Sequence, residues 1–140
     1  MAPAIREFEC QSALESVQRK ALIIDDNAQD LSDEARLLET HGFDTVKCRS
    51  YDEAVRLIER DLFDLVVMSQ GSLAFEGRIV MRYLQRYMPY TPCIVTAQLE
   101  NTKCRVEAHE LGAEGYVVKP ISEQQMRNLV HKLFGDHLVA

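Results

Sequence analysis

Short apolar runs alternate along the chain with longer segments in which apolar residues recur every three or four positions. The runs cover residues 21–24, 65–68, 91–97 and 116–118, and a weakly alternating run covers residues 43–48. Runs that are apolar on both faces are typical of parallel strands covered by helices on both sides. The intervening segments have the spacing of amphipathic helices. The pattern predicts an α/β fold in which strands and helices alternate five times.

Capping and breaking residues mark the ends of the predicted helices. Ser50 and Ser122 each precede a Glu or Gln by three positions, the spacing of a capping box. Pro89 stops the third helix, and Gly112 suits the position just after the fourth. Crossovers between parallel strands are right-handed, so helices would cover both faces of the sheet. We therefore predict a flavodoxin-like (βα)5 fold, a doubly wound parallel sheet with strand order 2-1-3-4-5.

Length and charge limit the function classes. The chain has 140 residues, which suits one domain over residues 20–140 after an N-terminal extension, residues 1–19, that is either a short amphipathic helix or an irregular leader. The net charge of −6 argues against direct binding to nucleic acid or to an anionic membrane. The last predicted helix ends near residue 134, so we expect no output domain. The chain is then either a stand-alone module or a fragment.

The four cysteines and the start of the chain indicate a reducing compartment. Cys10, Cys48, Cys93 and Cys104 are far apart and form no CxxC pair, so we interpret them as scattered buried thiols. No apolar stretch approaches the length of a membrane span, and the first residues lack a signal-peptide pattern. These observations predict a cytoplasmic protein.

Polar residues that could bind a ligand or take part in a reaction follow several of the predicted strands. Asp25 and Asp26 follow the first, Ser69 the third, Thr96 ends the fourth, and Lys119 follows the fifth. The carboxyl ends of parallel strands meet at one edge of a sheet, where ligands collect. A pair of carboxylates at such an edge suits Mg²⁺.

Each of these residues also has an ordinary structural explanation. Asp25 and Asp26 could stabilise the start of the following helix by their negative charge. Lys119 could be a solvated lysine, Thr96 a residue of good strand propensity, and Tyr116 a core residue. Only their combination favours a functional site.

In order and spacing, these segments resemble the receiver domain of bacterial response regulators over residues 20–134. The resemblance rests on LIIDDN at 22–27, DLVVMS at 64–69, Gly77, PCIVTA at 92–97 and GYVVKP at 115–120. It implies a module of two-component phosphorelay signalling rather than an enzyme, with a histidine kinase or a downstream signalling protein as partner, and a monomer or weak homodimer as its state.

The resemblance also implies a role for each residue at the strand ends. Asp25, Asp26 and the backbone carbonyl of Gly71 would hold Mg²⁺. Residue 69 would be the aspartate that accepts a phosphoryl group from the kinase histidine. Thr96 and Lys119 would contact that phosphoryl group, and Tyr116 would change rotamer with them.

The chain departs from the family at the acceptor, where it has Ser69. A serine hydroxyl is neutral and needs a neighbouring base to act as a nucleophile, whereas an aspartate is already anionic at neutral pH. None of the four histidines follows a predicted strand, and a carboxylate bound to metal is a poor base. We therefore expect Ser69 to be passive and Mg²⁺ to bind weakly, or Lys119 to bridge directly to Asp25 and Asp26.

Three readings of the sequence stay open. The first is an atypical receiver that works through protein contacts on the face of its fourth and fifth strands and their helices. The second is an ordinary receiver with an engineered Asp-to-Ser change at position 69. The third is a small metal-dependent phosphohydrolase with Asp25 or Asp26 as nucleophile, although the short connections leave no cap over a substrate. Flavin binding is disfavoured because no phosphate loop follows the first strand.

In the loop after Ser69, we expect Phe75 to be partly exposed.

Overall fold

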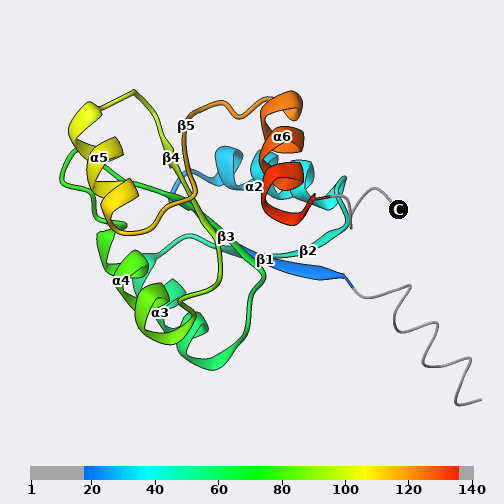
Figure 1. Cartoon of the computed structure of the whole chain (residues 1–140), viewed down its shortest axis with the longest axis horizontal. Coiled ribbons are helices and arrows are strands. Elements are labelled where there is room, and N and C mark those ends of the chain that lie inside the picture. The colour runs from blue at the N-terminus through cyan, green and yellow to red at the C-terminus, as the bar shows by residue number, and fades with distance from the viewer. Residues whose placement is uncertain (1–17, 136–140) are drawn as a thin grey trace, which may run out of the picture.

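Five parallel strands form a single sheet in the computed structural model, which describes residues 18–135 (Figure 1). The strands are β1 (Arg19–Ile24), β2 (Phe43–Cys48), β3 (Leu65–Ser69), β4 (Cys93–Ala97) and β5 (Gly115–Val118). Their order is β2-β1-β3-β4-β5, and every neighbouring pair is parallel. The predicted fold and strand order are confirmed.

Five helices cover the sheet. They are α2 (Ala28–Glu39), α3 (Tyr51–Arg60), α4 (Arg78–Tyr87), α5 (Thr102–Glu110) and α6 (Glu123–Phe134). Figure 1 shows α3, α4 and α5 on one face of the sheet and α2 and α6 on the other. None of the helices within the described residues is long and apolar enough to cross a membrane.

The core has one layer on each face of the sheet. Leu22 and Ile24 of β1 pack with α3, α4 and α5, whereas Ala21 and Ile23 of the same strand pack with α2 and α6. All four are at most 1% exposed. Since successive side chains of a strand point to opposite faces, a strand buried on both sides must be apolar throughout.

Side-chain caps start most of the helices. Ser122 and Gln125 form the complete predicted capping box at α6. At α3, Ser50 accepts a hydrogen bond from the Glu53 amide as predicted, but the Glu53 carboxylate accepts a bond from the Cys48 thiol instead of returning to the cap. Cys48, Cys93 and Cys104 are buried and free, as expected, while Cys10 lies outside the described residues. So does nearly all of the segment in which an N-terminal helix was considered.

The expected exposure of Phe75 is wrong. Phe75 is 1% exposed and belongs to the core layer under α3, α4 and α5, while Leu73 is 70% exposed. The loop turns inward because Glu76 accepts hydrogen bonds from the amide and hydroxyl of Ser72, and the Phe75 amide bonds to the Ser72 carbonyl. The left-handed backbone of Phe75, with φ of 57°, completes the turn.

Replacing Gly77 with alanine should destabilise the fold. Gly77 precedes α4, and a Cβ there would lie 2.9 Å from the Ser69 carbonyl oxygen and 2.7 Å from Met68 Cε. The methionine methyl can move, but the backbone of β3 cannot. We expect Gly77→Ala to lower the free energy of unfolding by about 1 to 3 kcal/mol, measured by urea denaturation. A loss below about 0.5 kcal/mol, the range of neutral surface changes, would contradict the contact.

Candidate functional site

The carboxyl ends of β1, β3, β4 and β5 bring the predicted residues to one edge of the sheet. Ser69 lies opposite Thr96 in the register of β3 and β4. A cavity of about 560 Å³ lies at this edge. It is lined by Asp26, Asn27, Tyr51, Ser69, Gly71, Ser72, Glu76, Gln98 and Lys119. Of the predicted residues, four line this cavity and three, Asp25, Thr96 and Tyr116, do not.

Lys119 joins two acidic side chains at the edge of this cavity. Its Nζ donates to Asp25 Oδ2 at 2.7 Å and to Asp30 Oδ2 at 3.2 Å. The Lys119 side chain is 5% exposed and Asp25 is fully buried. Burial alone would lower the pKa of Lys119, but its bonds to Asp25 and Asp30 outweigh that effect and raise the pKa. The predicted bridge thus reaches Asp25, with Asp30 in place of Asp26.

Asp26 lies apart from this ion pair. Its side chain is exposed and lines the cavity, and its backbone carbonyl accepts a hydrogen bond from Arg49 at 2.9 Å. Asp25 instead has both carboxylate oxygens engaged, since Oδ1 accepts from the Asn27 amide at 3.0 Å. The Asp25 carboxylate is therefore occupied by hydrogen bonds within the protein, whereas the Asp26 side chain lies at the cavity.

Glu34 is a buried carboxyl group that sequence reasoning missed. It is 3% exposed, and its Oε1 has no hydrogen-bond partner. Burial, and then the negative charge of Asp25, raise the pKa of Glu34 to about 8, although Lys119 opposes the shift. Its position was readable, because Glu34 falls on the same helical face as Leu31, Ala35 and Leu38.

Ser69 is buried at the end of β3. It is 4% exposed, and its Oγ accepts a hydrogen bond from the Gly71 amide at 3.3 Å. Its carbonyl accepts a bond from the Tyr51 hydroxyl at 2.6 Å. No carboxylate or imidazole within residues 18–135 hydrogen-bonds to Ser69 Oγ, so no base is in place to remove its proton.

Thr96 lies opposite Ser69 on β4, and Tyr116 lies on β5 beyond it. Thr96 is fully buried, and its hydroxyl has no hydrogen-bond partner. The Tyr116 hydroxyl donates to Gln70 Oε1 at 2.7 Å, and the Arg105 guanidinium lies 4.7 Å from the centre of the Tyr116 ring. Gln70 was not predicted, because nothing local in the sequence pairs it with a tyrosine 46 positions away.

The donor set fits Mg²⁺ only in part. Asp26 and Gly71 line the cavity, but Asp25 is already bonded to Lys119 and Asn27. Over residues 18–135, no three His, Cys, Asp or Glu side chains are grouped so that they could hold a metal ion. Mg²⁺ accepts one or two carboxylates together with waters and other oxygens. The arrangement supplies one available carboxylate and a backbone carbonyl.

The sequence model of the response regulator receiver domain matches residues 21–131. A probable transcriptional regulator ycf27 from Porphyridium aerugineum is 30% identical over 113 residues, which is 78% of this chain and 45% of that protein. The response regulator protein PilR from Pseudomonas aeruginosa is 31% identical over 117 residues, or 81% of this chain and 25% of PilR. The chain therefore spans less than half the length of these relatives.

Solved structures share the fold. A CheY-like receiver domain from Methanospirillum hungatei superposes with a TM-score of 0.76 at 20% identity, covering 89% of this chain and all of that one. The receiver domain of the sensor histidine kinase PA1611 from Pseudomonas aeruginosa, which has a magnesium ion coordinated in its active site cleft, gives 0.74 at 18% identity and covers 85% and 99%.

Proposed function

Because the chain belongs to the response regulator receiver domain family, we propose that it is an atypical receiver that signals without accepting phosphate by the aspartate route. The observation that carries this proposal is Ser69, buried and without a base, at the position where the resemblance places the acceptor aspartate. A neutral hydroxyl attacks a phosphoryl group only when a base removes its proton. The coarser function, a receiver domain of two-component signalling, follows from the family.

Of the three residues that the resemblance assigns to phosphoryl contact and switching, Lys119 and Tyr116 are engaged with the protein itself, whereas the Thr96 hydroxyl has no hydrogen-bond partner. Lys119 is bonded to Asp25 and Asp30, and Tyr116 is bonded to Gln70. A phosphoryl group on residue 69 would normally compete for these partners. Without one, the arrangement of Lys119 and Tyr116 has no competitor. We infer a single resting arrangement of the site that partner proteins recognise as it stands.

Partners and metal follow from the same arrangement. We infer that the chain binds a histidine kinase or a downstream signalling protein, as the family implies.

Mg²⁺ would be held weakly by Asp26 and the Gly71 carbonyl, and it would supply positive charge toward an anion in the cavity. A phosphohydrolase reaction at Asp25 gains no support, because both of its carboxylate oxygens already accept hydrogen bonds. The same reaction with Asp26 as nucleophile stays a prediction, since Asp26 lines the cavity. We propose that the extension precedes β1, which begins at Arg19, one residue before the domain boundary of 20 that was expected from the sequence.

Acetyl phosphate and Mg²⁺ should leave the protein unmodified. The full chain is incubated with both at neutral pH and its intact mass is measured, with an ordinary aspartate-bearing receiver treated in parallel as a control. We expect no added phosphoryl mass on this chain and a stoichiometric adduct on the control. A stoichiometric adduct on this chain would overturn the proposal. Loss of the adduct in acid would place it on a carboxylate or a histidine, and survival in acid would place it on a hydroxyl group such as that of Ser69.

A further inference from the structure

Helix α4 presents two parallel rows of side chains on its outer side, of which Tyr83 is half-buried against the core. The two rows each follow i, i+4, i+8 spacing, so their members stack along the helix about 6 Å apart. One row is Arg78, Arg82 and Arg86, and the other is Ile79, Tyr83 and Tyr87. We call these six residues the α4 face. The opposite side of the helix packs into the core through Val80, Met81 and Leu84.

The α4 face is basic, aromatic and accessible. Ile79 is 49% exposed and Tyr87 is 43% exposed, and the rings of Tyr83 and Tyr87 stack at 5.8 Å. Arg78 is paired with Glu107, whereas Arg82 and Arg86 form no salt bridge with any residue in the described part of the chain. A hollow of about 500 Å³ lies over this part of the helix. It is lined by Arg82, Tyr83, Gln85, Arg86 and Tyr87.

Its charge is opposite to that of the rest of the molecule. Helix α4 holds three arginines and no acidic residue, in a chain whose net charge is −6. Arg82 and Arg86, which form no salt bridge within residues 18–135, lie beside the exposed ring of Tyr87, and this is the composition of a binding hot spot rather than of an ordinary solvated helix. Arginine pairs with carboxylates through two parallel hydrogen bonds, which suits it to such a surface.

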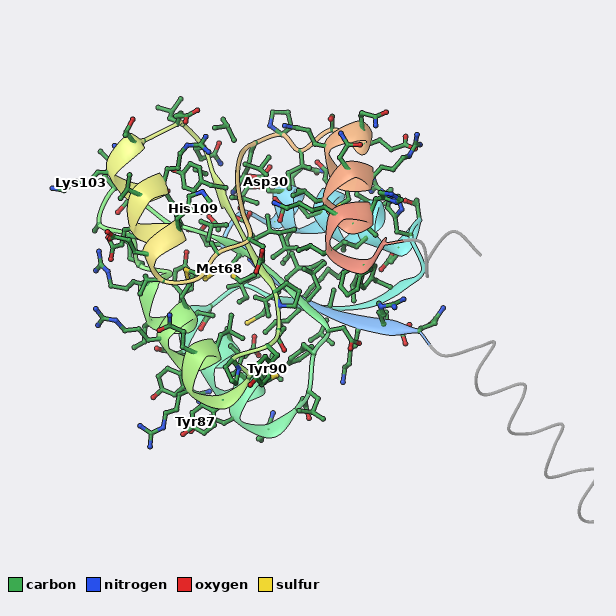
Figure 2. The ribbon with its side chains drawn as sticks, in the orientation of Figure 1. Asp30, Met68, Tyr87, Tyr90, Lys103 and His109 are labelled. Carbon is green, nitrogen blue, oxygen red and sulfur yellow. The ribbon has the colours of Figure 1, made fainter. Side chains whose placement is uncertain are left out.

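The α4 face lies beside the surface that the sequence predicted for partners rather than on it, since Arg78 of α4 is paired with Glu107 of α5. Figure 1 shows α4 beside α3, on the other side of the sheet from α6. In Figure 2, Tyr87 and Tyr90 lie at the opposite end of the molecule from Asp30, which marks the edge with Ser69. Within β4, α5, β5 and α6, the described elements of the predicted surface, only Val106 is a large exposed hydrophobic residue, and Leu99 is exposed in the loop between β4 and α5. The larger apolar exposure is on and beside α4.

We propose that the α4 face binds an acidic amphipathic helix of another protein. Carboxylates four positions apart on such a helix have the same spacing of about 6 Å as Arg82 and Arg86, so both pairs form in one register. An adjacent apolar row on the partner covers Ile79, Tyr83 and Tyr87. This inference shares with the proposed function only the premise that the chain works through protein contacts. It uses no residue of the cavity at Ser69.

The test uses the full chain and a synthetic helical peptide with glutamates four positions apart beside a row of leucines. A second peptide replaces those glutamates with lysines. Binding is measured by isothermal titration and located by NMR chemical shifts. We expect the acidic peptide to bind with shifts confined to α4 and its neighbours, and the lysine peptide not to bind. Failure of the acidic peptide to bind, or shifts centred on α5 and α6, would overturn the proposal.

Matched charge reversals distinguish specific binding at the α4 face from non-specific attraction due to net charge. Two double variants are compared. The first combines Arg82→Glu with Arg86→Glu, and the second combines Lys103→Glu on α5 with Arg127→Glu on α6. Both change the net charge by the same amount. We expect the first to weaken binding at least tenfold and the second less than threefold. Equal losses of affinity for the acidic peptide in the two double variants would overturn the proposal. Tighter binding of a DNA duplex than of the acidic peptide at the same salt concentration would also overturn it, as would self-association that only the first double variant abolishes. The phosphorylation test above is unaffected by any of these results, so the two proposals fail separately.

Discussion

Replacing Glu34 with glutamine is expected to stabilise the protein at neutral pH. The Glu34 pKa rises from 4.5 to about 8 on folding, so near pH 7 the folded protein holds a proton that the unfolded chain has released. Each pKa unit corresponds to about 1.4 kcal/mol, and we expect Glu34→Gln to raise the free energy of unfolding by about 2 to 3 kcal/mol at pH 7. Glutamine has the shape of the protonated acid and no charge to bury.

The pH dependence of this gain has a definite sign. Since the folded pKa lies above the unfolded one, Glu34 makes the wild-type protein lose stability as pH rises from 4.5 to about 8. The difference between variant and wild type should be small at pH 4.5, grow through this window and level off above it. Urea denaturation at several pH values measures it directly. Comparing the two proteins cancels the titration of all other carboxyl groups.

An exposed carboxylate provides the control for Glu34. Glu110→Gln removes the same charge from the solvent side of α5 and should change stability by less than about 0.5 kcal/mol at every pH. If Glu34→Gln were instead destabilising, Glu34 would be ionised in the folded protein and needed as a partner of Lys119. A gain that did not vary with pH would point to packing rather than to titration.

The fold was predictable because each strand and helix signals itself locally. The apolar run of β3, buried on both faces, and the Ser122 cap of α6 depend on residues within a few positions of each other. The positions of Asp25, Ser69, and Lys119 followed from topology, because parallel strands end at one edge.

The partnerships within the site were not predictable in the same way. Lys119 bonds to Asp30, 89 positions away, rather than to Asp26 beside Asp25. That choice depends on how the first turn of α2 is oriented against β5, which no local pattern encodes. The burial of Phe75 likewise depends on the hydrogen bonds that close its loop. Glu34 is the exception, since its helical face was visible in the sequence.

Replacing Ser69 with aspartate is expected to turn a protein that acetyl phosphate leaves unmodified into one that it phosphorylates stoichiometrically. The new carboxylate would lie opposite Thr96 and bring an anionic nucleophile to the cavity that Asp26 and Lys119 line. It would also add a charge for Mg²⁺. Two unit charges 4 Å apart interact by about 4 kcal/mol at an effective dielectric near 20, and divalent Mg²⁺ doubles that energy, so Mg²⁺ affinity should rise at least tenfold after desolvation offsets part of the gain.

Asparagine at position 69 is the matched control, because it has the size of aspartate without its charge and should restore neither phosphorylation nor metal affinity. The NMR shifts of Thr96 and Tyr116 on addition of Mg²⁺ and beryllofluoride then report whether the site can still switch. We expect no change in the wild-type protein and a coordinated change in Ser69→Asp, because only an anion on residue 69 would compete for Lys119 and for the Tyr116–Gln70 bond. If the Ser69→Asp variant stays unmodified, the Lys119 bridge to Asp25 and Asp30 has closed the site independently of Ser69. If the variant is phosphorylated, the rest of the site is that of an ordinary receiver.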